Sequence, residues 1–166
     1  MAHAASLLAS LPNGSAEPSN VFENLKLSKS ASLLVRGHAS PEEWAKANYR
    51  WSENAQTSPR AIAFPATTED VQQIVRFGTS RRVQLAVKGG GHAQWPCNGI
   101  DGGLVCDLAL MRSVRIAEDR KSVYIGGGCR WGDVFPVTDQ ADLAVVGGGV
   151  ADVGVCGRLS PAARHD

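Results

Sequence analysis

The alternation of apolar and polar residues predicts three consecutive elements between residues 61 and 87. The run AIAFP (61–65) is a short apolar strand that ends at a proline, and VQLAV (83–87) alternates as a second strand. Between them, TTEDVQQIVRFGTSRR (67–82) carries apolar residues at the spacing of one helix face. The residues predicted on that buried face are Val71, Ile74, Val75 and Gly78. A strand, a helix and a strand in this order predict a right-handed βαβ unit on a parallel pair of strands.

Two segments begin with residues that cap helices. Thr67 is followed three residues later by Asp70, which approximates a capping box. Upstream, in SPEEWAKANYRW, Ser40 can cap a helix whose first position suits Pro41, and two glutamates follow at the positive end of the helix dipole. Residues 1–35 show no such pattern, and we expect them to form a loose lead-in.

After residue 100 the pattern changes to short strands and one more helix. The polar turn EDRK suggests that two of these strands form a hairpin. A helix is predicted from Trp131 onward, with Pro136 either in its first turn or breaking it. The strands are expected at residues 104–108, 114–117, 122–125, 144–149 and 153–157. The predicted fold class is therefore α+β, with a βαβ start followed by a mixed sheet and flanking helices.

Composition and charge exclude several classes of protein. Of the 166 residues 43% are hydrophobic, which is enough for a buried core, and the formal net charge is only +1. A nucleic-acid or anionic membrane surface needs a concentrated basic face, so neither partner is expected. No apolar run approaches the length of a membrane span. The first residues lack the charged start of a signal peptide and are interrupted by Pro12, so we favour an intracellular location.

Cysteine and histidine spacing predicts neither a metal site nor a disulfide framework. The four cysteines contain no C-x-x-C pair, and the four histidines are scattered. We expect the cysteines to be ordinary thiols, several of them buried. They are Cys97, Cys106, Cys129 and Cys156.

Glycine triplets follow apolar segments at residues 89–91, 126–128 and 147–149. Glycine lets consecutive backbone N–H groups converge on an anion, because no Cβ blocks the approach. No triplet extends to G-x-G-x-x-G, and the sequence has no G-x-x-x-x-G-K-[ST], so neither a Rossmann fingerprint nor a P-loop is predicted. From the residues alone, tight turns between strands remain the alternative.

Three longer segments occur in a distinctive order. They are RAIAFPATTEDVQQIVRFGTSRRVQLAVKGGGHA, DGGLVCDLALMRSVRIAEDRKSVYIGGGCRWGDV and LAVVGGGVADVGVCG. Together they resemble the amino-terminal part of an FAD-binding domain of the PCMH type. This domain occurs in vanillyl-alcohol-oxidase-like and berberine-bridge-enzyme-like oxidoreductases, including fungal FAD-linked oxidases of secondary metabolism. The resemblance covers residues 36–157 and leaves residues 158–166 as a tail outside the family pattern.

The resemblance implies that the loop after the second parallel strand wraps the FAD pyrophosphate with backbone amides. It also implies that His92 bonds covalently to the methyl carbon on the benzenoid ring of the flavin. The alternative for His92 is a loop histidine bonded to a backbone carbonyl. The residues carried over to this loop are Lys88, Gly89, Gly90, Gly91, His92 and Ala93.

A second stretch, which runs beside the flavin in the family, carries over to Gly149, Val153, Gly154 and Gly157. Cys156 stands where the family usually has glycine, and we expect it to be a small buried side chain. Members with a second flavin-linking cysteine carry it at the position of Val150, so no cysteinyl link is predicted. Asp107, at the end of a strand, is expected to cap a turn.

The function implied is that of an FAD-dependent oxidoreductase, which passes a hydride from a small organic substrate to flavin N5. We expect the chain to be a truncated member that lacks the substrate domain and its catalytic base, and that is inactive alone. Two alternatives are a non-enzymatic remnant that acts as a small binding or interaction module, and a fragment that associates with a separately encoded half.

Overall fold

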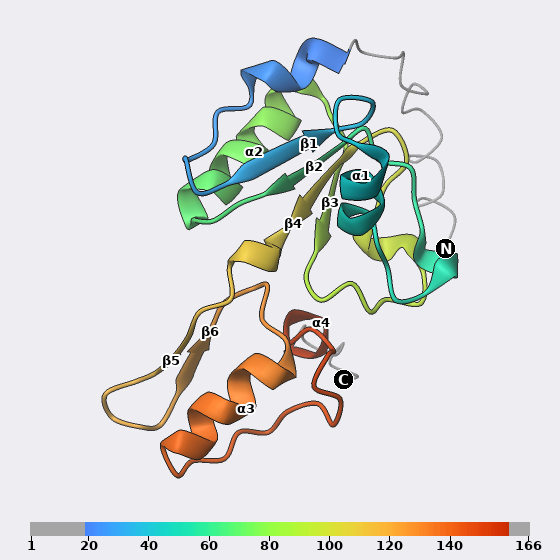
Figure 1. The fold of residues 1–166 in the computed structure, drawn as a ribbon. Coiled ribbons are helices and arrows are strands. Elements are labelled where there is room, and N and C mark those ends of the chain that lie inside the picture. The colour runs from blue at the N-terminus through green and yellow to red at the C-terminus, as the bar shows by residue number, and fades with distance from the viewer. Residues whose placement is uncertain (1–18, 160–166) are drawn as a thin grey trace, which may run out of the picture.

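A four-stranded sheet and a hairpin-and-helix unit make up the fold in the computed structural model, which describes residues 19–159 (Figure 1). In the sheet, β2, β4 and β3 are parallel and β1 is antiparallel to β2. The spatial order is β1 (Ser32–Val35), β2 (Ala61–Phe64), β4 (Leu104–Asp107) and β3 (Leu85–Lys88). The hairpin-and-helix unit contains the antiparallel pair β5 (Val114–Ile116) and β6 (Val123–Ile125), with α3 (Trp131–Gln140). The predicted α+β class and βαβ start are confirmed.

Both helix starts predicted from capping residues form where expected. Ser40 and Glu43 make a capping box before α1 (Pro41–Ala47), and Thr67 and Asp70 make one before α2 (Thr68–Arg81). The remaining helical segments are η1 (Ser19–Asn24), η2 (Glu53–Ala55), η3 (Pro96–Asn98), η4 (Leu108–Leu110) and α4 (Cys156–Leu159). No helix in the described part of the chain combines the length and apolar character needed to cross a membrane.

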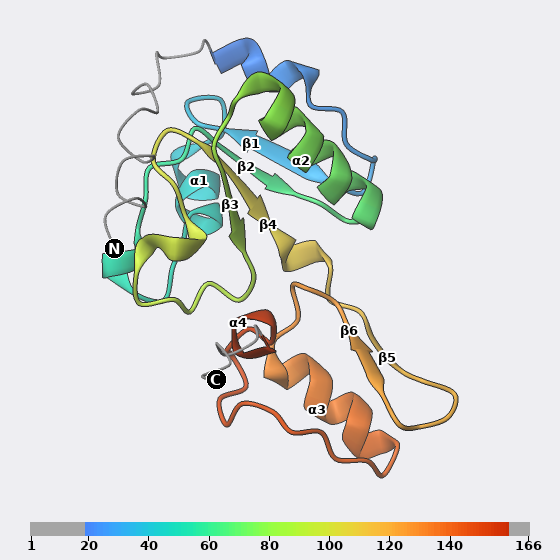
Figure 2. The same ribbon diagram turned by 180° about the vertical axis from the view of Figure 1, so that it is seen from behind.

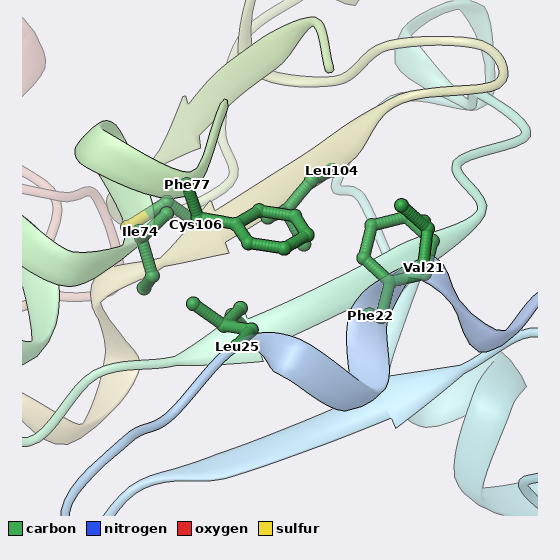
Figure 3. Close-up of a cluster of buried hydrophobic side chains, with 9 residues drawn as sticks. Val21, Phe22, Leu25, Ile74, Phe77, Leu104 and Cys106 are labelled. Carbon is green, nitrogen blue, oxygen red and sulfur yellow. The ribbon is translucent and has the colours of Figure 1, made fainter. Parts of the chain in front are cut away.

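The central strands β2 and β4 are apolar except for Asp107 at the end of β4, because side chains cover both faces of the sheet. Toward α2 and η1, Ala61, Ala63 and Leu104 pack in one cluster with Phe22 and Phe77 (Figure 3). The side chains at the alternate positions of β2 and β4 point to the other face of the sheet. There they pack with Ala47 of α1 in a second cluster. This two-sided burial fixes the register of β2 and β4, and so fixes where the loops at their carboxyl ends emerge.

Residues 19–35, which we expected in a loose lead-in, belong to the folded structure. Phe22 is fully buried, and its ring centroid lies 6.0 Å from that of Phe77. Val21 and Leu25 are buried beside it, and β1 pairs with β2. The expectation is wrong for these residues because an isolated apolar cluster, rather than a periodic pattern, anchors them. The predictions for residues 1–18 and 160–166 lie outside the described residues.

The buried face of α2 is rotated from the predicted one. Ile74 and Gly78 are buried as expected, but Val75 is 51% exposed and Phe77 is buried instead. One residue along a helix turns the side chain by about 100°, so Val75 cannot share the face of Ile74 and Phe77. A Cβ at Gly78 would lie 2.5 Å from Cδ1 of Leu85, so this glycine lets β3 pack closely against the helix.

The strands predicted at residues 144–149 and 153–157 do not form. Residues 144–149 are irregular, and the later segment makes one isolated bridge, Arg130 to Gly154, before α4 begins. The reason lies in Trp131, whose buried indole lies against Gly147 and Gly148. A Cβ on either glycine would come within 2.7 Å of an indole atom, so these glycines allow close packing rather than strand pairing.

Pro136 lies inside α3, neither in its first turn nor at a break. The helix loses one backbone hydrogen bond there. It nonetheless continues to Gln140, because Trp131, Val134 and Thr138 are buried on one face. The expected core role of Trp131 is confirmed.

Asp70 joins Ser28, in the segment that follows η1, to the start of α2. Its carboxylate accepts hydrogen bonds from Ser28 N at 2.7 Å, Ser28 Oγ at 2.9 Å, and the backbone N–H groups of Ala66 and Thr67, both at 3.1 Å. Burial by itself raises the pKa of Asp70. The hydrogen bonds together lower the pKa by more than burial raises it, so the pKa lies below its usual value. The ionised carboxylate therefore stabilises the native state.

We expect Asp70→Ala to lower the free energy of unfolding by about 3 kcal/mol at pH 7, since it removes a helix cap and charged hydrogen bonds. A lowered pKa gives stability that is present above the unfolded-state pKa of about 3.9 and is lost as the pH falls through the folded value. The difference from wild type should therefore shrink below about pH 4. Urea unfolding at several pH values measures it. Glu69→Ala, an exposed change in the same helix turn, is the control, and an equal loss there would contradict the assignment.

Candidate functional site

A cleft of about 680 Å³ lies at the carboxyl end of β3. One wall is the loop at residues 89–93 and the other is the segment at residues 153–157, which leads into α4. Figures 1 and 2 both show α4 at the junction of the sheet and the hairpin-and-helix unit. Other residues that line the cleft are Val87, Cys97, Asn98 and Leu108. The volume falls within the usual range of cofactor pockets.

The loop after β3 presents backbone donors that the protein does not use. None of the backbone N–H groups of residues 89–93 donates a hydrogen bond to the described part of the chain, and neither does that of Gly154. Successive backbone N–H groups that face a cleft can form a concavity that binds an anion, and this loop has such groups to offer.

Glycines allow the two walls to meet backbone to backbone. A Cβ at Gly90 would lie 2.4 Å from the backbone N of Gly154, and a Cβ at Gly154 would lie 2.5 Å from the backbone N of Gly90. Gly91 also has φ +75°, a conformation that side-chain-bearing residues rarely adopt. The close approach and the turn explain why the loop needs glycine at these two positions of its triplet.

His92 lines the cleft, and two neighbours, Asp152 and Trp51, hold its side chain. Its Nε2 lies 3.1 Å from Oδ2 of Asp152. The indole of Trp51 stacks on the imidazole, with ring centroids 5.5 Å apart and planes 19° from parallel. The backbone N–H of Trp51 donates to the carbonyl of Gly91 at 3.1 Å, which ties this aromatic residue to the glycine loop. The imidazole is therefore oriented by the protein before any ligand enters.

Lys88 lies beneath the loop rather than among the residues that line the cleft. Its Nζ is 2.7 Å from Oδ2 of buried Asp107, and its Cε lies 3.0 Å from where a Cβ at Gly91 would be. Asp107 also accepts the backbone N–H of Ala109 at 3.0 Å, which is the turn-capping role expected for it. The ion pair supports the loop from below, and the charge of Lys88 is already compensated there.

The second predicted stretch is only partly at the cleft. Val153, Gly154 and Gly157 line it, whereas Gly149 does not. A Cβ at Gly149 would meet no atom within 4 Å. The described residues contain no group of three or more His, Cys, Asp or Glu that could hold a metal ion.

Cys156 lines the cleft and is exposed, so its expected burial is wrong. It follows the wall that Val153 and Gly154 form, and its Cβ is 4.0 Å from a Cβ placed on Gly89. Cys97 is the other exposed thiol, and it also lines the cleft. Cys106 and Cys129 are buried, and burial, with the nearby Asp107 carboxylate, raises the pKa of Cys106 to about 11.

Three residues at the site had no sequence signal: Trp51, Arg130 and Asp152. The loop glycines stand out because they are adjacent in sequence. By contrast, these three side chains reach His92 or its partner from elements that are remote along the chain. Only the folded structure brings them together.

The amino-acid sequence matches the family described as "FAD binding domain" over residues 59–163. It is similar to the FAD-dependent monooxygenase prx3 of Penicillium roqueforti, with 38% identity over 111 residues, 66% of this chain and 22% of that protein. It is also similar to the FAD-dependent monooxygenase tpcD of Cochliobolus heterostrophus, with 31% identity over 109 residues, 64% of this chain and 21% of that protein. The chain thus spans about a fifth of the length of these curated relatives.

Solved structures show the same arrangement of elements. The 6-hydroxy-D-nicotine oxidase of Arthrobacter nicotinovorans superposes with a TM-score of 0.72 at 28% identity, over 81% of this chain and 29% of that one. A glucooligosaccharide oxidase from Acremonium strictum, described with a 6-S-cysteinyl, 8α-N1-histidyl FAD, gives a TM-score of 0.64 at 31% identity. That match covers 74% of this chain and 26% of the oxidase.

Proposed function

The chain belongs to the FAD-binding-domain family, among the vanillyl-alcohol-oxidase-like and berberine-bridge-enzyme-like oxidoreductases, and from this premise we propose that its cleft binds FAD. The observation that carries the proposal is the run of backbone N–H groups at residues 89–93, which has no acceptor within the described chain. These donors suit the pyrophosphate, which carries two negative charges and many acceptor oxygens. The absence of side chains at Gly90 and Gly154 lets a dinucleotide approach the main chain of both walls.

We propose that His92 is the attachment residue for the flavin methyl group. It closes the glycine loop, lines the cleft and is oriented by Asp152 and Trp51. The relative with a histidyl-linked FAD supports this assignment. The resemblance to the family puts Val150 at the position of the second linking residue, and valine, which is exposed here, has no nucleophile for a cysteinyl link.

FAD supplies the hydride acceptor for oxidation of a small organic substrate. We propose that this oxidation needs residues beyond the described cleft, so that the chain binds FAD but does not turn over substrate alone. The titratable side chains lining the described cleft are His92, Cys97 and Cys156. With His92 attached to the flavin, the two thiols are the titratable side chains that remain among the residues lining the cleft.

Titration of the purified chain with FAD tests the function. We expect the flavin absorbance to shift on binding and part of the colour to remain with the protein after acid precipitation. A chain that folds cooperatively but leaves the flavin spectrum unchanged at millimolar FAD would refute FAD binding, and would favour the alternative of a non-enzymatic interaction module.

Thiol labelling gives an independent measure of occupancy. We expect Cys97 and Cys156 to react rapidly with a thiol reagent, because both are exposed, and bound FAD to protect them. Cys106 should react far more slowly, since a pKa of about 11 leaves roughly a hundredth of the thiolate of an ordinary cysteine at pH 8. Mass spectrometry of labelled peptides, with and without FAD, measures each site. Rapid labelling of Cys106 in the folded chain would contradict its buried position. Labelling of Cys97 and Cys156 that FAD does not slow would contradict FAD binding in the cleft.

A further inference from the structure

Asp152 contacts the proposed attachment residue, His92, on one side and the cation of Arg130 on the other. Its Oδ2 lies 3.1 Å from Nε2 of His92, and its Oδ1 is paired with the guanidinium of Arg130. No hydrogen bond to Nδ1 of His92 is formed by the described residues. The two imidazole nitrogens are therefore in different environments, one bonded to a carboxylate and one without a partner from residues 19–159.

The carboxylate decides which imidazole nitrogen carries the proton. The hydrogen bond from His92, followed by the charge of Arg130, keeps the pKa of Asp152 below its usual value, so it is ionised at neutral pH. An ionised carboxylate can only accept hydrogen bonds. Nε2 must then be the protonated nitrogen, and in the neutral imidazole the lone pair lies on Nδ1.

The backbone on both sides of Asp152 is fixed by the first turn of α3. Trp131 N donates to the carbonyl of Val153 at 3.1 Å, and Gly132 N donates to the carbonyl of Ala151 at 2.8 Å. The Asp152 side chain itself is 62% exposed. Its position is therefore set by the main chain, and its removal takes the partner from Nε2 of His92, whose side chain is 16% exposed.

We propose that Asp152 is a positioning residue that holds His92 with the proton on Nε2 and presents the Nδ1 lone pair for attachment of the flavin. The inference rests on the proposed FAD site and adds to it the residue and the nitrogen that control attachment. Arg130 holds the second carboxylate oxygen, and Trp51 prevents the imidazole from tilting away from this bond.

Attachment of the flavin to His92 is a two-electron oxidation, and dioxygen is the oxidant. A bond forms from Nδ1 of His92 to the flavin methyl carbon, and one C–H bond of that methyl group breaks. The imidazole becomes positively charged as Nδ1 shares its lone pair, and the Asp152 carboxylate stabilises this charge and favours release of the Nε2 proton. One proton leaves the methyl group and one leaves Nε2, and the two electrons pass through the flavin to dioxygen, which becomes hydrogen peroxide.

The first test needs no flavin. In the 166-residue chain with ¹⁵N-labelled histidine, long-range ¹H–¹⁵N spectra above pH 8, where free imidazole is neutral, report which nitrogen of His92 is protonated. We expect the proton on Nε2 in wild type and a mixture of both tautomers in Asp152→Ala. Asp139→Ala, an exposed aspartate on α3, is the matched control and should resemble wild type.

The second test follows attachment after FAD is added to the same proteins. We expect covalent incorporation to slow by roughly tenfold or more in Asp152→Ala, the effect of losing one charged hydrogen bond, while the Kd for non-covalent FAD stays within about twofold. Digestion and NMR of the flavin-bearing peptide should identify Nδ1 as the linked atom in wild type.

Several outcomes would overturn the proposal. They are a wild-type proton on Nδ1, an unchanged tautomer in Asp152→Ala, linkage through Nε2, or a Kd that rises as much as the rate falls, which would indicate a merely structural role. If wild type binds no FAD, the proposed function fails, but the histidine spectra still decide the role of Asp152.

Discussion

Gly90→Ala is expected to abolish FAD binding and to lower the free energy of unfolding by about 3 kcal/mol. The added Cβ would lie 2.4 Å from the backbone N and 2.5 Å from Cα of Gly154. Both contacts are with main chain, which cannot rotate away as a side chain could. One wall of the cleft must therefore move, and the backbone donors of the two walls can no longer face the same ligand. FAD titration and urea unfolding of the same preparation measure the two effects.

Gly149→Ala is the matched control for this experiment. Gly149 also belongs to a glycine triplet, but a Cβ there meets no atom within 4 Å, and its φ is not in the left-handed region. Its stability should stay within about 0.5 kcal/mol of wild type, with unchanged FAD binding. Equal effects of the two substitutions would show that the contact between Gly90 and Gly154 does not hold the cleft together.

His92→Ala is expected to eliminate covalent flavin completely while leaving non-covalent binding within about tenfold of wild type. The loss is total because alanine offers no nucleophile, whereas the backbone donors of the loop are unchanged. Fluorescence of the protein band after denaturing electrophoresis measures attached flavin, and equilibrium dialysis measures the Kd.

His38→Ala serves as the control, since His38 is exposed and lies in the turn between β1 and α1. It should retain the fluorescence of wild type. Fluorescence that persists in His92→Ala would place the link on another residue, and Cys97 and Cys156 would then be the nucleophiles to replace next.

The sequence predicted the parts of the fold that depend on neighbouring residues. The capping residues of α1 and α2, the βαβ order and the β5–β6 hairpin follow from local patterns, and all of them form. Two of the errors share one cause, which is contact between remote segments. Residues 19–35 are ordered by Phe22 and Phe77, and the glycines at 147 and 148 are required by Trp131.

The same division applies to the site. The glycine loop and His92 were predicted because they are adjacent and belong to a known pattern, and the structure places them together at a cleft. Asp152 is 60 residues from His92, and nothing in its local sequence indicates that it reaches the imidazole. The exposure of Cys156 was missed for the same reason, since it depends on where α4 begins relative to the loop.

The sheet and the hairpin-and-helix unit have separate apolar interiors, because the cluster around Phe22 and the cluster around Trp131 have no residue in common. The contacts between the two units, such as Gly90 with Gly154 and Leu108 with Gly127, lie outside both sets of buried residues. Contacts of this kind, rather than a shared core, hold the two walls of the cleft together. A ligand that spans both walls adds its binding free energy to these contacts, and so would itself stabilise the closed arrangement.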